Sequence, residues 1–321
     1  MWYLISGNAE RIPREVRFDE LVLSTDEFDV RITRDDEIYQ WTFSEADKVQ
    51  QGGFRADDNP AHGSAVDILN RLIVGRQSSS LYFPTFRRIE GGYSTTGLHK
   101  VRSEANRQEG VQRELQGLAE RISVLDHRFI CSISTNDLVS LLTQRYASVS
   151  EALNAEYKNF STSIIDTIRV AKSKGQQSVE RDGPAILNEI QSRADTINAL
   201  QEQLLRPFAL LADLTGKLFR HTGISIQAVT LGQSADAIDS GLLSAGEKQM
   251  LSFLCYNAFS QDSVIFIDEP ELSLHPDWQR RLFGILLKQQ PTNQFIVATH
   301  SPFIYTKYED KEIAIQEEKG E

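Results

Sequence analysis

The sequence predicts an α/β fold, with a parallel-sheet core, a strand-rich N-terminal part and an inserted helical lobe. Three observations predict it. Residues 207–321 alternate apolar strands with helices, residues 1–98 contain strand-like alternation, and residues 99–206 show the periodicity of packed helices. We expect these three ranges to be the segments of the chain, with the first and last forming the core.

Residues 1 to about 45 contain two segments in which apolar and polar side chains alternate, as they do in half-buried strands. A turn is expected between them at Asp35-Asp36, and the apolar segment that begins at Met1 is also expected to be a strand. Residues 65–75 predict a short amphipathic helix, and residues 81–86 predict a strand. The alternating apolar residues are Phe28, Val30 and Ile32 in one segment and Tyr39, Trp41 and Phe43 in the next.

Residues 99–206 are polar, and their apolar residues recur at intervals of three and four, as in packed or coiled helices. Residues 172–177 predict a connection at which two helices fold back on each other. A helix of about 30 residues extends roughly 45 Å, so we expect a lobe and not long coiled-coil arms. The recurring residues are Leu115, Leu118, Ile122 and Leu125, followed by Leu187, Ile190, Ala194 and Ile197.

Residues 207–321 return to alternating strands and helices, which indicates a parallel sheet. Strands are expected near 224–230, at 264–267, at 295–299 and at 312–315, and helices from Ser244 and from Pro276 to Lys288. The strand at 264–267 is apolar without interruption, as a sheet covered on both faces requires.

Composition bounds the function. The chain of 321 residues has a formal net charge of −11, which argues against nucleic-acid binding by the whole surface but leaves a local basic groove open. Cys131 and Cys255 lie far apart without CxxC spacing, which argues against a disulfide framework or a zinc site. We expect a cytoplasmic protein without membrane contact, because neither a long apolar run nor a signal-peptide pattern is present.

The strongest chemical signal is the apolar strand 264–267, which delivers Asp268 and Glu269 at its carboxyl end, where ligands of parallel sheets bind. Two adjacent carboxylates there are costly unless a cation compensates them. An Asp that holds Mg²⁺ and a Glu that activates water would explain the pair. The alternative is a strand that ends in a solvated acidic turn.

Two neighbouring segments favour the first interpretation. Ser244 and Glu247 form a capping-box pattern at a helix start, which is either a structural cap or an anion site. Residues 295–302 form another apolar strand that ends in polar residues, among them His300. Together with the carboxylate pair, His300 is interpreted as a group that contacts a phosphate or the attacking water.

The segments LSAGEKQ, IFIDEPELSLHPDWQ and FIVATHSPF, in this order and spacing, resemble the second half of ATP-binding-cassette ATPases with a P-loop NTPase fold. Among these, the sequence is similar to the RecF, SMC and OLD-nuclease-like group of AAA-type core ATPases, some of which belong to bacterial anti-phage systems. The likeness is specific over residues 240–313 and looser over residues 81–92.

The resemblance implies ATP and Mg²⁺ as cofactors and assigns roles to six residues. Ser244, Gly246 and Lys248 look like the signature segment that contacts the ATP of an opposing protomer, which implies a homodimer with ATP between its subunits. Asp268 matches the Mg²⁺ ligand, Glu269 the catalytic glutamate and His300 the switch histidine. An effector nuclease or another defence protein is the implied partner, and contact with DNA stays open.

Three departures qualify the resemblance. Ala245 replaces a glycine of the commonest signature, and His275 falls where transporter cassettes have an aspartate. No GxxxxGK[ST] loop is present, since the Gly216-Lys217 pair is followed by Leu218. We expect the phosphate-binding loop to lie upstream of Met1, and we expect residues 1–321 alone not to hydrolyse ATP.

Several alternatives stay open. Arg87 and Arg88 lie either near the nucleotide or a DNA-facing edge, or in solvent at a strand end. The basic residues of 100–113 alternate with glutamates and are interpreted as a solvated helix face. A transporter cassette is a competing function, although the helical lobe counts against it. The other competing interpretation is a catalytically incomplete remnant or interaction module, which kept the fold and lost ATP binding.

Overall fold

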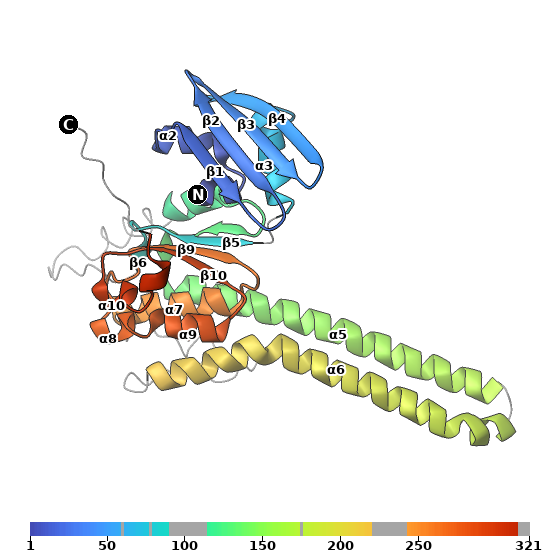
Figure 1. The fold of residues 1–321 in the computed structure, drawn as a ribbon. Helices are drawn as coiled ribbons and strands as arrows, with labels where there is room; N and C mark the ends of the chain where they lie inside the picture. Colours follow the sequence, from blue (N-terminus) through green and yellow to red (C-terminus); the bar gives the residue numbers. More distant parts are fainter. Residues whose placement is uncertain (59–60, 77–78, 90–113, 174–175, 220–242, 314–321) are drawn as a thin grey trace. The chain divides into compact units, whose positions relative to one another are not determined.

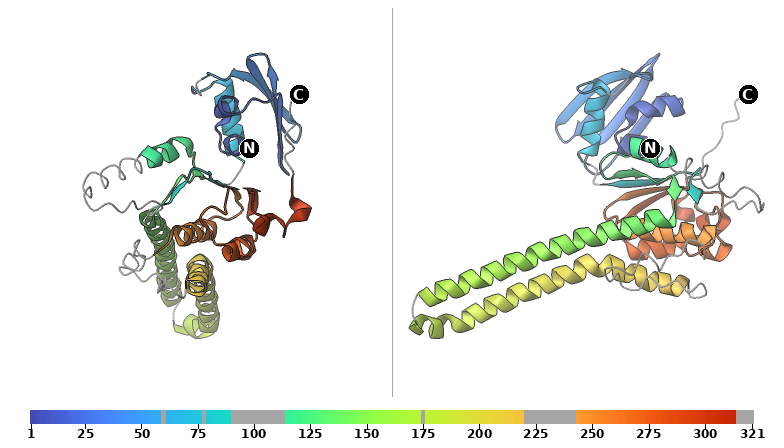
Figure 2. Two further views of the ribbon diagram at one scale, coloured as in Figure 1. Left: turned by 90° about the vertical axis from the view of Figure 1, so that its left-hand side faces the viewer. Right: turned by 180° about the vertical axis from the view of Figure 1, so that it is seen from behind.

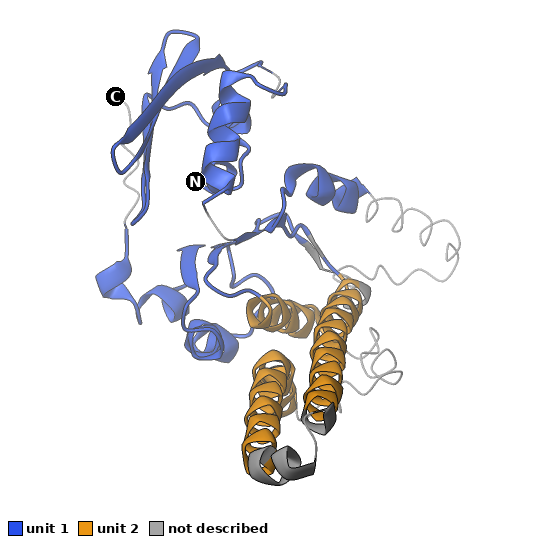
Figure 3. Ribbon diagram, turned by 90° about the vertical axis from the view of Figure 1, so that its right-hand side faces the viewer, with its two compact units in different colours: residues 1–133, 260–321 blue, residues 134–259 orange. Residues whose placement is uncertain are grey.

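The computed structural model describes residues 1–58, 61–76, 79–89, 114–173, 176–219 and 243–313 (Figure 1; Figure 2 gives two further views). The chain divides into two compact units, residues 1–133 with 260–321 and residues 134–259 (Figure 3). The segment boundaries expected from the sequence, 98/99 and 206/207, therefore differ from those of the units. The difference arises because residues 114–133 belong to the first unit and residues 207–259 to the second.

The first unit is built around a parallel sheet with the strand order β10-β9-β5-β7. Its strands are β5 (Ser80–Phe83), β7 (His127–Phe129), β9 (Val264–Asp268) and β10 (Gln294–Ala298). Ile265, Phe266 and Ile267 of β9 are buried, as the uninterrupted apolar run predicted. A short parallel pair, β6 (Arg88–Ile89) with β8 (Ser132–Ile133), lies in the same unit.

Short helices gather beside β10 in Figure 1. They are α8 (Pro276–Gln279), α9 (Leu282–Gln289) and α10 (Pro302–Tyr305), and the 3-10 turn η2 (Glu309–Lys311) follows. The helix expected over Pro276 to Lys288 is thus interrupted, because Arg280 and Arg281 form a turn. Phe283 of α9 packs against Phe295 of β10, with ring centroids 5.7 Å apart.

The chain begins with helix α1 (Trp2–Ile5) and not with the strand that was expected at Met1. The Trp2 ring packs 5.5 Å from that of Tyr82 on β5 and 5.6 Å from that of Phe129 on β7. Trp2, Leu4 and Ile5 are all buried, so the apolar run covers a sheet face as a helix. The 3-10 turn η1 (Ala9–Arg11) and helix α2 (Ile12–Glu15) follow.

An antiparallel sheet with the order β1-β2-β3-β4 follows α2. Its strands are β1 (Glu20–Ser24), β2 (Asp29–Asp35), β3 (Ile38–Glu45) and β4 (Lys48–Arg55). The predicted alternation and turn are confirmed, since Val30, Ile32 and Trp41 are buried and Asp36 has a φ of 52°. The sequence did not predict β4. Helix α3 (Ala65–Val74), capped by Ser64, confirms the amphipathic helix expected at 65–75.

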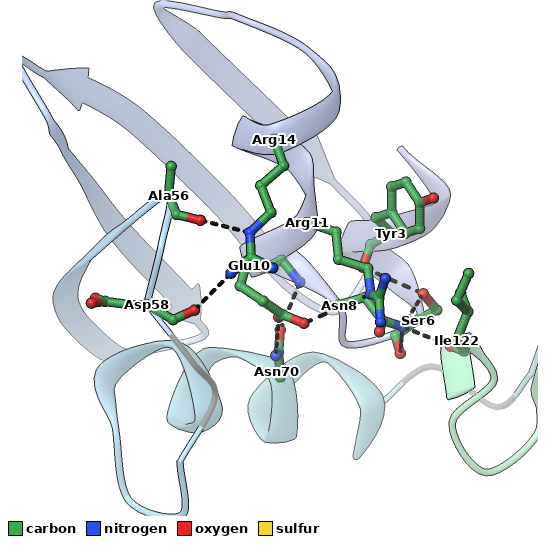
Figure 4. Close-up of polar contacts among 11 residues, drawn as sticks. Tyr3, Ser6, Asn8, Glu10, Arg11, Arg14, Ala56, Asp58, Asn70 and Ile122 are labelled. Atoms are coloured by element: carbon green, nitrogen blue, oxygen red, sulfur yellow. Dashed lines mark hydrogen bonds and ion pairs between the residues drawn. The ribbon is translucent and has the colours of Figure 1, made fainter. Parts of the chain in front are cut away.

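A buried polar cluster joins these pieces (Figure 4). The Asn8 side chain donates to the carbonyl of Ile122 at 3.0 Å. Asn70 of α3 accepts the backbone N–H of Ala9 at 3.0 Å and donates to the Glu10 carboxylate at 3.0 Å. The bonds satisfy groups that would be costly to bury alone, so they fix the segment that connects α1 to α2.

Residues 114–122 are helical but do not belong to the helical lobe. Leu115, Leu118 and Ile122 pack against the core of the first unit. Leu125 is 81% exposed and has a φ of 52°, so it lies beyond the helix. The periodicity was interpreted correctly as helical, but its partner is the α/β core.

The second unit consists of α5 (Thr135–Ser173), α6 (Gln176–Leu218) and α7 (Ala245–Ala258). Helices α5 and α6 contain 39 and 43 residues and lie antiparallel, side by side (Figures 1 and 2). They extend about 58 Å and 64 Å at 1.5 Å per residue, so the expectation that this region is too short for long helical arms was wrong. Helix α6 contains Pro184 and Pro207 in its interior.

Three of the four residues expected on the apolar side of α6 lie on its packed side, namely Ile190, Ala194 and Ile197, and only Leu187 does not. Leu187 is 67% exposed, whereas Ile197 is 7% exposed; Ile186, Ile190 and Ala194 are half-buried. Tyr157 of α5 donates to Gln201 of α6 at 2.9 Å across the pair.

Two expected strands lie wholly or partly outside the described residues. Residues 224–230 lie outside the described residues, and so do residues 314–315 of the last strand, whereas Glu312 and Ile313 are irregular. Both cysteines are free and buried. Within the part of the chain that the structure describes, no helix combines the length and apolar character needed to cross a membrane.

Candidate functional site

Two neighbouring parallel strands end at the same edge of the first unit's sheet and carry three of the residues that the sequence singled out. Strand β9 ends at Asp268, and Glu269 follows. Strand β10 ends at Ala298, two residues before His300, and Ala298 pairs with Asp268 in the parallel register. The candidate residues therefore lie at the carboxyl edge, where folds of this class bind ligands.

Glu269 and His300 are in contact. His300 Nε2 lies 3.3 Å from Glu269 Oε1, with the Glu269 side chain 23% exposed and the His300 side chain 91% exposed. Glu269 has a φ of 49°, and its backbone N–H donates to the carbonyl of Ala298 at 2.8 Å. The left-handed backbone turns the glutamate out of the strand direction, and the arrangement leaves a solvent-facing carboxylate–imidazole pair.

Glu271 fixes the loop that carries His300. One carboxylate oxygen accepts the backbone N–H of His300 at 2.8 Å, and the other accepts the Thr299 hydroxyl at 2.7 Å. Desolvation raises the pKa of the Glu269 carboxyl, the neighbouring Glu271 carboxylate raises it further, and His300 lowers it. The edge therefore concentrates negative charge, which a cation or a hydrogen-bond donor would stabilise.

Gln279 of α8 extends this network. The Ser301 hydroxyl donates to its side-chain oxygen at 2.6 Å, and its amide nitrogen donates to the carbonyl of Leu274 at 2.8 Å. The segment after β9 and the loop after β10 are thus joined through side chains from both. Such networks keep reactive groups in place when the chain around them is irregular.

The loop after β5 contributes two more residues. The Thr85 hydroxyl donates to the Asp268 carboxylate. Arg87 is 7% exposed, and its guanidinium donates to the carbonyls of Asp268 at 2.6 Å and Glu269 at 2.7 Å. Of the two interpretations left open for the arginine pair, the solvated one is wrong for Arg87, and the side chain of Arg88 lies outside the described residues.

Sequence reasoning missed Thr85, Glu271 and Gln279, because their roles depend on bonds between segments far apart in the chain. A partial signal was present for Thr85 and Arg87, which directly follow an apolar strand of the same sheet. The residues that follow parallel strands lie at one edge of the sheet. The polar residues after each apolar strand could therefore have been predicted to lie together in the site.

The signature-like residues lie at the start of α7 in the second unit. Ser244 is the N-cap: its hydroxyl accepts the N–H of Glu247 at 3.3 Å, and the Glu247 carboxylate accepts the N–H of Ser244 at 2.7 Å. The capping box is therefore formed as predicted. Gly246 is buried, and Lys248 is 3% exposed. The helix start belongs to the second unit and the carboxylate edge to the first.

His275 caps a helix. Its Nδ1 accepts the backbone N–H of Asp277 at 3.3 Å, directly before Pro276. His275 therefore has a structural role at the start of α8.

The chemistry of the edge fits Mg²⁺. Asp268 offers a carboxylate that is half-buried, and Thr85 offers a hydroxyl beside it. Among the described residues, no group of three or more His, Cys, Asp or Glu side chains is arranged to hold a metal. Mg²⁺ is usually bound through one or two carboxylates together with the substrate's phosphates and water, so the Asp268 carboxylate with the neighbouring Thr85 hydroxyl fits this ion.

Comparison with known proteins decides the family. The family model described as "AAA domain, putative AbiEii toxin, Type IV TA system" matches residues 135–305, which is more than half of the chain. The chain belongs to this family. The matched range contains α5, α6 and α7 and the residues Asp268, Glu269 and His300. The predicted α/β fold and the predicted membership of the AAA-type ATPase group are confirmed for this AAA-domain chain.

Two curated relatives match short parts of the AAA-domain chain. The Retron Vc95 probable ATPase of Vibrio cholerae serotype O1 biovar El Tor is 37% identical over 59 residues, covering 18% of this chain and 12% of its own length. The Retron Ec83 probable ATPase of Escherichia coli is 36% identical over 73 residues, covering 19% of this chain and 14% of its own length. The matched segments are thus about an eighth of each relative.

Among solved structures, the chain is similar to the Smc head domain of Pyrococcus furiosus, which was determined with an extended coiled coil and bound to the C-terminal domain of ScpA. The match has a TM-score of 0.31 and 12% identity, and it covers 95% of this chain and 80% of that one.

Proposed function

We propose that this AAA-domain chain takes part in ATP binding and hydrolysis, with Glu269 as the catalytic carboxylate. The observation that carries the proposal is the contact between Glu269 and His300, beside Asp268, at the carboxyl edge of a parallel sheet. Membership of an AAA-domain family supports nucleotide binding.

Each side chain at the edge has a chemical task. Asp268 would hold Mg²⁺, which supplies charge neutralisation for the transferred phosphate when it is bound. The Glu269 carboxylate would accept a hydrogen bond from the attacking water and draw its proton. His300, almost fully exposed, would donate a hydrogen bond to the γ-phosphate or hold the water from the other side.

A dimer with ATP between two subunits is part of the proposal. Ser244, Gly246 and Lys248 lie at the N-terminus of α7, where the helix dipole favours an anion. In the dimer they would contact the nucleotide held by the other subunit. The support is the well-formed helix start together with the family membership.

The biological setting is proposed from the relatives. Two retron-associated probable ATPases match the chain, which supports a role in a bacterial anti-phage system. We propose that hydrolysis changes the state of an effector, such as a nuclease or another defence protein, with or without DNA.

Measurement of Mg²⁺-dependent ATP binding and turnover tests the proposal. Residues 1–321 would be compared with the same chain extended upstream by a segment that bears a phosphate-binding loop. The sequence itself contains no GxxxxGK[ST] loop, so we expect turnover from the extended chain and little from the shorter one. Binding and turnover absent from both would favour the alternative, an interaction module without ATPase activity.

A further inference from the structure

Arg87 is a buried cation directly beneath the carboxylate edge. It is 7% exposed, and it lies in the loop that follows β5, the strand next to β9. One terminal nitrogen donates to the carbonyls of Pro84 at 3.0 Å and Asp268 at 2.6 Å, and the other donates to the carbonyl of Glu269 at 2.7 Å. The side chain thus joins the loop after one strand to the turn after the next.

The geometry depends on the forked shape of a guanidinium. Its two terminal nitrogens point in fixed directions and reach two successive carbonyls at once. A lysine has a single ammonium nitrogen and would bind only one of the two carbonyls in this geometry. Desolvation lowers the pKa of Arg87 to about 10, whereas the nearby Asp268, Glu271 and Glu269 carboxylates raise it, so the group is charged at neutral pH.

The turn that Arg87 contacts has an unfavourable backbone conformation. Glu269 has a φ of 49°, and residues with a Cβ adopt this region only when their surroundings hold them there. Two hydrogen bonds hold the Glu269 backbone. Its N–H donates to the carbonyl of Ala298 at 2.8 Å, and its carbonyl accepts a bond from the Arg87 guanidinium. The direction of the Glu269 side chain follows from this backbone.

We propose that Arg87 is a positioning residue, whose guanidinium holds the turn at Asp268 and Glu269 so that the Glu269 carboxylate faces His300. It contacts main-chain oxygens and acts on the reaction through Glu269. Its effect on turnover rests on the proposed ATPase function, whereas its effect on the turn does not.

The first test measures amide hydrogen exchange of Glu269 in residues 1–321. Arg87→Lys keeps the charge and loses the fork, and Arg87→Gln loses the charge and keeps one donor group. Both should speed exchange at Glu269 by about tenfold or more, while the amides of Ile265 and Ile267 in β9 stay protected. Exchange at Glu269 that is unchanged in both variants overturns the proposal.

Arg14 provides a matched control. Its guanidinium also spans two carbonyls, those of Ala56 at 2.7 Å and Asp58 at 3.1 Å, but it is exposed and lies at the N-terminal sheet. Arg14→Lys should leave the Glu269 amide unchanged. If Arg87→Lys instead speeds exchange at all amides of β9, loss of the fold explains the result. Exchange at Glu269 is then measured in Arg87→Gln with added methylguanidinium. Restored protection at Glu269 supports positioning, and its absence contradicts it.

The second test uses turnover in the chain extended with a phosphate-binding loop. Arg87→Lys should lower kcat by more than about tenfold and change KM for ATP by less than about threefold, since the carboxylate and not the nucleotide is displaced. Methylguanidinium should restore part of kcat in Arg87→Gln. A wild-type chain without turnover would refute the proposed function, and the exchange test would still decide the role of Arg87.

Discussion

Glu271 and His300 are joined by a hydrogen bond in which the backbone N–H of His300 donates to Glu271 Oε1 at 2.8 Å. The other Glu271 oxygen accepts the Thr299 hydroxyl, so one carboxylate fixes two successive residues of the loop. This bond sets the position from which the His300 ring reaches Glu269. It also explains why the acidic segment continues with a second glutamate after Pro270.

Replacing Glu271 by Gln should therefore loosen the His300 loop. An amide accepts through its oxygen alone, so one of the two bonds is lost, at about 1–2 kcal/mol. We expect turnover of the loop-extended chain to fall by about tenfold, with nucleotide affinity unchanged. Glu309→Gln, an exposed glutamate of η2, is the control and should have no effect. A Glu271→Gln chain with wild-type turnover would refute the role.

Ser244→Arg should block the ATP-dependent dimer while sparing the binding of one nucleotide. The substitution also removes the cap on Glu247, at about 1 kcal/mol. Ser244→Ala is therefore the matched control, because it removes the cap without adding bulk at the proposed subunit contact. Sedimentation of the chain extended with a phosphate-binding loop, in the presence of Mg²⁺ and ATP, should show dimers for Ser244→Ala and monomers for Ser244→Arg. The same dimer in both would rule out the ATP-bridged arrangement.

Stability should fall in acid because of His127. The side chain is 1% exposed, its Nδ1 lies 2.8 Å from the Ser80 hydroxyl, and desolvation lowers its pKa although Asp126 opposes the shift. The unfolded histidine, with a pKa of about 6.5, takes up its proton first as pH falls. The stabilising contribution is therefore complete above about pH 6.5 and is lost progressively as pH falls toward the folded pKa.

Tryptophan fluorescence during urea unfolding measures this effect in the first unit, because Trp2, Trp41 and Trp278 all lie in it. The unfolding free energy should fall less between about pH 7.5 and pH 5.5 in His127→Asn than in the wild-type chain. His62→Asn, whose histidine side chain is 90% exposed, should behave as wild type. An equal fall in the unfolding free energy of all three chains would show that His127 does not cause the loss of stability in acid.

Gly7 should tolerate no side chain. Its φ is 70°, and an added Cβ would lie 2.5 Å from Val74 Cγ2. Gly63 has a similar φ of 85° with nothing within 4 Å of its Cβ position, so Gly63→Ala isolates the backbone effect. We expect Gly7→Ala to lower the unfolding free energy by about 1–3 kcal/mol more than Gly63→Ala. Equal losses in the two variants would show that the Val74 contact is readily relieved.

Local sequence patterns predicted the parts of the fold whose signals are local. The alternation in β2 and β3, the apolar run of β9 and the capping box at Ser244 each depend on residues a few positions apart, and the structure confirms them. The location of Glu269 and His300 at the carboxyl edge of the sheet followed from a topological rule, since parallel strands end at one edge, whereas their contact was not predicted.

The rest depended on tertiary contacts. The segment at Met1 is apolar enough for a strand, but Trp2 forms a helix because it packs on Tyr82 and Phe129. Leu115 and Ile122 show helical spacing, yet the spacing does not specify which core they join. The sequence left open whether Arg87 is solvated. Its partners are the carbonyls of Asp268 and Glu269, and a contact with residues so distant in sequence cannot be inferred from the neighbours of Arg87.

The central claim, that Glu269 is the catalytic carboxylate, is tested most directly by Glu269→Gln in the chain extended with a phosphate-binding loop. The substitution keeps the shape and removes the charge that draws a proton from water. Asp268→Ala is the companion variant and should weaken Mg²⁺-dependent nucleotide binding. We predict that Glu269→Gln binds Mg²⁺-ATP with wild-type affinity and loses turnover by about a hundredfold or more. Turnover of Glu269→Gln at the wild-type rate would contradict the account.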